Sequence, residues 1–101
     1  MLEKITKEMF GERVGSTFRV SIGEGDESVD LVLSELEERK APGGYETFSL
    51  AFRGPLEPAL EQRMFLFEHE TLEPFNLFIV PIARDPDGMI YEAIVNRKVT
   101  A

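Results

Sequence analysis

Apolar and polar residues alternate over most of the chain, and this period of two predicts β-strands. Residues 18–22 and 29–33 alternate on either side of Gly23–Ser28, whose composition is typical of a turn. Residues 48–52 form a third alternating run. This run ends at Gly54-Pro55, because proline cannot donate a hydrogen bond to a ladder. The pattern therefore predicts a hairpin followed by a third strand.

Three further runs follow, at residues 62–68, 75–83 and 89–96. The last two are joined by Asp85–Gly88, a strong turn signal, because proline presets the second turn position and glycine tolerates positive φ. Pro81 requires a strand edge or a bulge, since it removes a ladder hydrogen bond. Six short strands with short connections predict a mainly β fold, an antiparallel six-stranded small barrel or sandwich whose strands pair in chain order.

The first eleven residues follow a helical pattern instead. Leu2, Ile5 and Met9 are spaced by three and four, so they share one helical face, and Gly11 is a typical helix end. We expect a short N-terminal helix that docks these residues and Phe10 on the strands. We also expect residues 1–101 to fold as a single domain.

Two of the predicted strands are apolar on both faces. The run 75–83 has one set of alternating apolar residues at Phe75, Leu77 and Ile79 and a second set at Phe78, Val80 and Ile82. A small barrel buries only one face, so the N-terminal helix, residues 56–60 or another chain must cover the second. Because the run 62–68 repeats this pattern, we expect self-association or binding to another protein. The predicted interface consists of Phe65, Phe67, Phe78 and Val80.

Charge and composition exclude several classes of function. The chain has 19 acidic and 11 basic residues, a net charge of -8 that disfavours nucleic acid and anionic membrane surfaces as partners. It has no cysteine, which excludes disulfides and thiol chemistry and favours a reducing compartment. No apolar stretch could span a bilayer, and the first eight residues are too charged for the core of a signal peptide. A cytoplasmic location is expected.

His69 is the single histidine and the one weak catalytic candidate. Histidine titrates near neutrality and can act as a general base, and Glu68 and Glu70 flank it. On a strand, however, residues 68 and 70 point to the face opposite residue 69. A histidine that fixes a turn by a hydrogen bond is therefore the favoured interpretation. No spaced metal-ligand motif, phosphate-binding loop or nucleophile elbow is present, so we predict no metal and no cofactor.

A second candidate site involves strand ends. Arg53 either binds an anion or pairs with a carboxylate, and the second interpretation is favoured. Arg53, His69 and Asn96 each lie near the end of a predicted strand. Because strand ends can converge at one rim of a barrel, these three residues form a candidate rim site.

Several short segments together resemble a bacterial family of short, uncharacterised domains. The segments are Phe52-Arg53-Gly54-Pro55, Glu68-His69, Leu77-Phe78-Ile79-Val80-Pro81-Ile82, Gly88 and Tyr91-Glu92-Ala93-Ile94-Val95-Asn96. The family has no assigned activity, and its relatives accompany phage-tail-like fibre or collar proteins. The resemblance therefore implies an assembly or accessory role. The family's Leu-Gly turn after the Glu-His pair is replaced here by Leu72-Glu73-Pro74, so we expect this turn to differ.

Three functional hypotheses follow from the sequence. The favoured one is a non-enzymatic assembly or protein-binding module. The second is a carrier of small apolar molecules, although six short strands leave little interior space. Its cavity would be lined by Phe48, Leu50, Phe52, Leu66 and Ile79. The third is a hydrolase or isomerase that uses His69 with a carboxylate brought close by folding.

Overall fold

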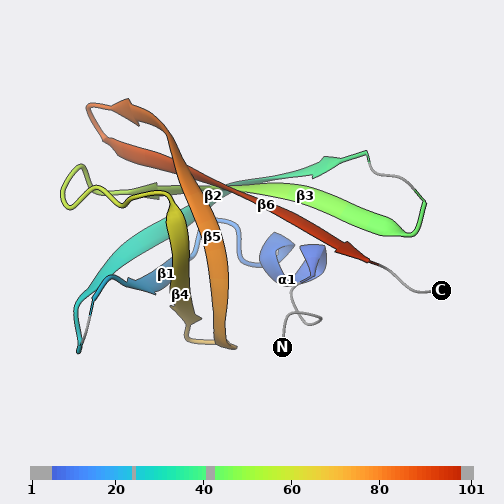
Figure 1. The fold of residues 1–101 in the computed structure, drawn as a ribbon, viewed down its shortest axis with the longest axis horizontal. Helices are drawn as coiled ribbons and strands as arrows, with labels where there is room; N and C mark the ends of the chain where they lie inside the picture. Colours follow the sequence, from blue (N-terminus) through green and yellow to red (C-terminus); the bar gives the residue numbers. More distant parts are fainter. Residues whose placement is uncertain (1–5, 24, 41–42, 99–101) are drawn as a thin grey trace.

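The computed structural model describes residues 6–23, 25–40 and 43–98. This part of the chain contains one short helix and six strands, which confirms the predicted mainly β fold (Figure 1). The elements are α1 (Lys7–Gly11), β1 (Thr17–Ser21), β2 (Ser28–Arg39), β3 (Tyr45–Gly54), β4 (Arg63–His69), β5 (Leu72–Asp85) and β6 (Gly88–Lys98). All strand pairs are antiparallel, and the sheet closes into a barrel.

The strand order around the barrel is β1-β2-β3-β6-β5-β4, with β4 returning to β1. Pairing in chain order was therefore wrong at one step, because β3 pairs with β6 and not with β4. Residues 55–62 carry the chain across the barrel end instead, and the prolines Pro55 and Pro58 keep this crossing out of the sheet. Leu60, within the crossing, is buried and donates its backbone N–H to the Tyr91 hydroxyl over 2.8 Å.

Side chains fill the interior of the barrel. Phe18, Phe52, Phe67 and Phe75 form a connected cluster, with ring centroids 5.2 to 6.4 Å apart. Aliphatic side chains from five strands and Phe65 from β4 complete this core; the aliphatic residues are Val20, Val29, Leu31, Leu33, Leu50, Leu77, Ile79, Met89 and Ala93. The contacts between these large side chains stabilise the small barrel by apolar burial. The same side chains occupy the interior, where the carrier hypothesis places its ligand cavity.

The helix α1 closes one end of the barrel. Thr6 caps it by accepting the Met9 N–H over 3.1 Å. Phe10 is fully buried, and its ring centroid lies 6.2, 6.1 and 5.6 Å from those of Phe18, Phe48 and Phe75. The predicted docking of the helix is thus confirmed for Phe10, whereas Leu2 and Ile5 lie outside the described residues. In the described part of the chain, no helix is long and apolar enough to cross a membrane.

Beyond the barrel, part of the sheet continues as a wing. The β5·β6 ladder ends at Val80 and Glu92, whereas β6 stays paired with β3 as far as Lys98. The far halves of β2, β3 and β6 therefore extend outward, and α1 lies in the angle between β5 and β6 (Figure 1). The register of β5 against β6 shifts between Pro81 and Ala83, so of the two expected alternatives, a strand edge or a bulge, the structure has the bulge.

Candidate functional site

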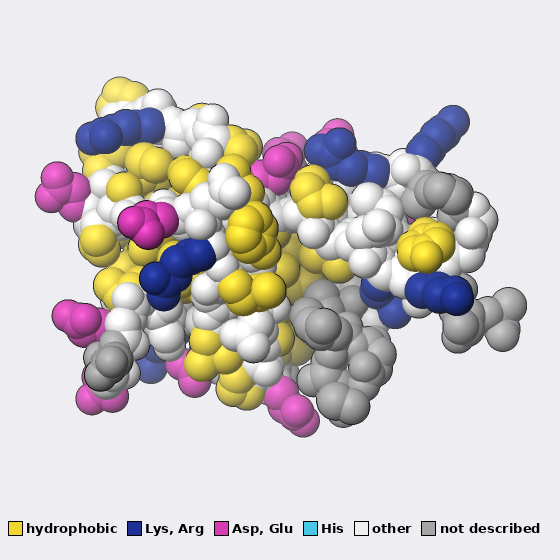
Figure 2. All heavy atoms as spheres, in the orientation of Figure 1, with side chains coloured by type: hydrophobic (Ala, Val, Ile, Leu, Met, Phe, Trp, Pro, Cys, Tyr) yellow, Lys and Arg dark blue, Asp and Glu magenta, His cyan; other side chains and the backbone are white. Residues whose placement is uncertain are grey.

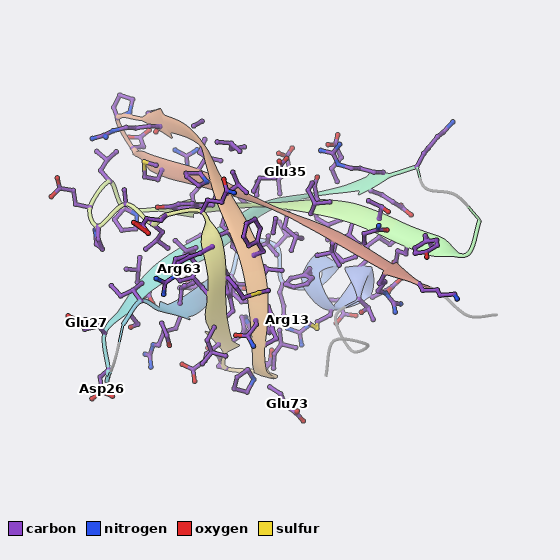
Figure 3. All side chains as sticks on the ribbon, in the orientation of Figure 1. Arg13, Asp26, Glu27, Glu35, Arg63 and Glu73 are labelled. Atoms are coloured by element: carbon purple, nitrogen blue, oxygen red, sulfur yellow. The ribbon has the colours of Figure 1, made fainter. Side chains whose placement is uncertain are left out.

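Five large apolar side chains remain exposed on the outside of β4, β5 and β6. They are Met64 (56% exposed), Leu66 (38%), Phe78 (45%), Ile82 (52%) and Ile94 (50%), and we call them the outer apolar face. Met64 lies directly opposite Phe78 in the β4·β5 ladder, so the two side chains are neighbours. Figure 2 shows hydrophobic side chains gathered over β4 and β5, and Figure 3 places Arg63 beside β4.

This face exists because β4 and β5 carry apolar residues in both phases of the strand. One phase faces into the barrel, so the other must face out. The helix that could have shielded it inserts Phe10 into the barrel end instead, and residues 55–62 cross the other end and bury Leu60. Neither α1 nor this crossing shields the outer apolar face.

The structure corrects the predicted interface in β4. Phe65 (5% exposed) and Phe67 (fully buried) face the interior, so neither can contact a partner on the surface. Phe78 is on the outer face as predicted, and Val80 lies there half-buried. The exposed residues of β4 are Met64 and Leu66, and Leu66 accordingly does not line the interior as the carrier hypothesis required. In β4 the interior takes the phenylalanines, whereas in β5 it takes Leu77 and Ile79 and leaves Phe78 outside.

A groove lies at the edge of this face, where β5 and β6 separate. It encloses about 210 Å³. Its lining comprises five apolar residues, two asparagines and one arginine: Met64, Asn76, Leu77, Phe78, Ile94, Val95, Asn96 and Arg97. No carboxylate of a described residue lines it, although the chain as a whole has a net charge of -8. The lining of the groove is therefore more apolar and less acidic than the chain as a whole.

His69 is held by a chain of hydrogen bonds. Its Nδ1 accepts the backbone N–H of Thr71 over 3.1 Å, so the proton of the neutral ring resides on Nε2. That Nε2–H donates to Ser16 Oγ over 3.0 Å, and the Ser16 hydroxyl donates to the Arg13 carbonyl over 2.6 Å. The favoured interpretation, a histidine that fixes a turn, is confirmed.

Arg13 closes this network from the other side. Its Nε donates to Thr71 Oγ1 over 2.9 Å, and the Thr71 hydroxyl lies 3.0 Å from His69 Nδ1 (Figure 3 labels Arg13). The bonds join the α1–β1 connection to the β4–β5 turn. Because Nε2 donates to Ser16, it cannot take the Ser16 proton, and no described carboxylate hydrogen bonds to the ring. The pair therefore lacks the arrangement of a catalytic serine and histidine.

Replacement of His69 tests this structural role. We expect His69→Ala to lower the free energy of unfolding by about 0.5–1.5 kcal/mol, because the hydrogen bonds of the ring to Ser16 and to the Thr71 N–H are lost. His69→Asn should cost less, since its side-chain oxygen can still accept that N–H. Urea denaturation measures both, and ring ¹⁵N shifts should show Nε2 as the protonated nitrogen. Equal costs for alanine and asparagine would contradict this assignment.

The candidate rim site does not assemble. Arg53 is opposite Ile90 in the β3·β6 ladder, and Asn96 is opposite Thr47, six residues away along β3. At about 3.3 Å per residue, this separates Arg53 from Asn96 by roughly 20 Å. Antiparallel strands end at opposite rims, which is why strand ends from β3 and β6 do not meet. Asn96 instead receives a hydrogen bond from the Thr47 hydroxyl over 2.8 Å.

Arg53 pairs with a carboxylate, as the favoured interpretation of the sequence held. Its Nη2 lies 3.0 and 2.9 Å from the two carboxylate oxygens of Asp85. The Arg53 guanidinium, with help from the Asp87 backbone N–H, lowers the pKa of Asp85 below its ordinary value of 3.8. The pair thus ties β3 to the end of β5 and offers no free site for an anion.

The lowered pKa of Asp85 predicts how this pair depends on pH. A depressed pKa stabilises the fold above the unfolded-state pKa, and this contribution is lost as pH falls through the folded-state pKa. The wild type should therefore be more stable than Asp85→Asn near pH 7, and the difference should shrink toward zero below the ordinary pKa of 3.8. Urea midpoints of both proteins from pH 7 to pH 2.5 would check this. A difference that stays constant with pH would argue against it.

Comparisons with known proteins identify one family, and its description names no activity. The model of a family described as "Domain of unknown function (DUF6916)" matches residues 5–95. No curated protein and no solved structure matches significantly. Within the described residues, no group of three or more acidic or histidine side chains could hold a metal ion.

Proposed function

We propose that this chain, which belongs to the DUF6916 family, is a non-enzymatic protein-binding module that docks a partner on the outer apolar face. One observation carries the proposal: Met64, Leu66, Phe78, Ile82 and Ile94 are 38 to 56% exposed on neighbouring strands. Contiguous exposed apolar side chains of this size typically mark interaction sites. Side chains fill the barrel, and hydrogen bonds to Ser16 and Thr71 hold the His69 ring.

The partner is another protein rather than a second copy of this chain. Each copy has a net charge of -8, so like charge opposes self-association. Lys98, at the end of β6, lies on the same side of that strand as Ile94 of the outer apolar face, and it forms no ion pair with a described residue. A partner surface that is apolar with carboxylates at its margin complements this arrangement. The resemblance to domains that accompany phage-tail-like proteins is consistent with a partner from such an assembly.

Phe78→Ser tests the proposal, and Val32→Ser is its matched control. Val32 is 37% exposed but lies on β2, away from the outer apolar face. Loss of a central aromatic contact typically costs about 2 kcal/mol or more, which is roughly a 30-fold loss of affinity. Both variants should fold, as judged by circular dichroism, and Val32→Ser should behave as the wild type.

The measurement is quantitative co-purification from cells that express the chain naturally, combined with native mass spectrometry. We expect a set of proteins that the wild type and Val32→Ser recover equally and that Phe78→Ser recovers at least tenfold less. Equal recovery by all three proteins would refute the proposal. A homodimer that Phe78→Ser dissociates would replace the heterologous partner with a second copy.

A further inference from the structure

We infer that the partner binds in extended form, as an added strand that pairs with the free edge of β6 between Ala93 and Lys98. This inference rests on the proposed function and names the kind of partner. Strand addition requires an open backbone edge, pockets beside it for alternate side chains, and no device that blocks the approach. The described residues provide the edge and the pocket at the point where β5 and β6 separate, and α1 packs there from the inward side, where Phe10 contacts Phe48 and Phe75.

The open edge follows from the two ladders of β6. The strand pairs with β3 from Met89 to Lys98, but with β5 only from Gly88 to Glu92. In an antiparallel strand, alternate residues direct their N–H and C=O groups to opposite sides. Every second residue between Ala93 and Lys98 therefore directs both groups away from β3, toward a side where no described strand pairs.

The end of β2 is a second open edge of the same sheet, and its side chains are more highly charged than those of β6. The pairing of β2 with β1 stops at Val32, so the end of β2 also lacks a strand on one side. That end carries Glu35, Glu37, Glu38 and Arg39, and charged side chains are a common protection of exposed edges. The corresponding part of β6 carries Ala93, Ile94 and Val95, with charges only at Arg97 and Lys98. The edge of β6 therefore lacks this protection over the residues beside the groove.

The groove supplies the side-chain pockets. Ile94 and Val95 from β6 line it together with Phe78 from β5 and Met64 from β4. An added strand with apolar residues at alternate positions would place them against these side chains. This groove is also where the outer apolar face meets the free backbone edge, so the two features form one continuous surface.

The charged residues near the groove indicate which kind of residue the added strand carries at its end. The Nε of Arg97 binds Glu46 over 2.7 Å, so its charge is already partnered, and Lys98 forms no ion pair with a described residue. Among the residues that the structure describes, no carboxylate lines the groove itself. The fitting segment is therefore extended and apolar at alternate positions, with an aspartate or glutamate beside Lys98.

Selection from a phage-displayed library of random twelve-residue peptides, with the purified full chain as bait, tests this inference. Enriched peptides should alternate apolar and polar residues and carry a terminal acidic residue. Ile94→Asp should weaken the binding of such a peptide at least tenfold, whereas Val32→Asp should leave it unchanged within twofold. On binding, amide exchange should slow between Ala93 and Lys98.

Synthetic versions of one enriched peptide separate strand pairing from simple apolar contact. N-methylation at alternate residues removes N–H donors without changing side chains. Methylation in the register that faces β6 should weaken binding at least tenfold, and methylation in the other register should have little effect. If Phe78→Ser abolishes binding but both methylated registers bind equally, the proposed function stands and strand addition fails. If no peptide is enriched, or if enriched peptides bind Ile94→Asp unchanged, this site is refuted, while co-purification still judges the proposed function separately.

Discussion

Phe10→Ala is expected to lower the free energy of unfolding by about 3–5 kcal/mol, the range for buried phenylalanine truncations. Phe10 is fully buried and contacts Phe18, Phe48 and Phe75 at the end of the barrel. Alanine would remove the only α1 side chain that is buried in the core, and α1 is too short to persist without this contact. Small domains are stable by only about 5–15 kcal/mol, so this loss is large. Urea or guanidinium denaturation followed by circular dichroism measures it.

Val14→Ala is the control for this prediction. Val14 follows α1 and is 47% exposed, so its truncation should change stability by less than about 0.5 kcal/mol. The vacated space in Phe10→Ala is lined by aromatic rings, and benzene should raise the midpoint of this variant but not that of the wild type. A stability loss below 1 kcal/mol for Phe10→Ala would show that α1 does not close the barrel.

Gly88→Ala is expected to cost more than about 2 kcal/mol, because the position imposes both backbone strain and a steric overlap. Gly88 begins β6 with φ of 150°, a conformation that residues with a Cβ rarely adopt. A Cβ at this position would also overlap the backbone carbonyl oxygen of Gly54 on the neighbouring β3. Backbone cannot move aside as a flexible side chain can, so the β3·β6 ladder must shift. Thermal and urea unfolding measure the effect.

Gly11→Ala provides the matched comparison. Gly11 ends α1, its φ is not positive, and a Cβ there would meet no atom within 4 Å. Alanine should therefore leave stability unchanged or raise it slightly, because alanine has the higher helix propensity. If Gly11→Ala and Gly88→Ala cost the same, the special role of Gly88 in closing the β5–β6 turn would be wrong.

The residues of the outer apolar face could be predicted only in part from the sequence. Alternation gave β5 two apolar sets, and the structure buries Phe75, Leu77 and Ile79 while exposing Phe78 and Ile82. In β4 the same reasoning chose the phenylalanines for the surface, and the structure buries them. Period-two alternation states which residues share a face but not which face points inward. That choice depends on the volume that the other five strands leave inside the barrel.

For Arg53 and His69, the sequence likewise predicted the role of the side chain but not its partners. The pairing of Arg53 with a carboxylate was predicted, but its partner Asp85 lies 32 residues away in the chain. The role of His69 as a turn-fixing residue followed from the side-chain directions on a strand. Its partner Ser16, and Arg13, which donates to the neighbouring Thr71, belong to the α1–β1 connection and could not be inferred from neighbouring residues. The rim site failed because strand direction at each rim depends on the pairing order.

By itself, the sequence determined the six strands, the main turns, the need for an edge or a bulge at Pro81 and the excess of apolar faces over what one small core can bury. These features depend on local periodicity and on backbone restrictions at proline and glycine. Only the tertiary structure decided that β3 pairs with β6, that Phe10 enters the barrel, and that β6 leaves β5 after Glu92. These depend on contacts between residues distant in the chain, where the competition for interior volume and for backbone partners is resolved over the whole barrel.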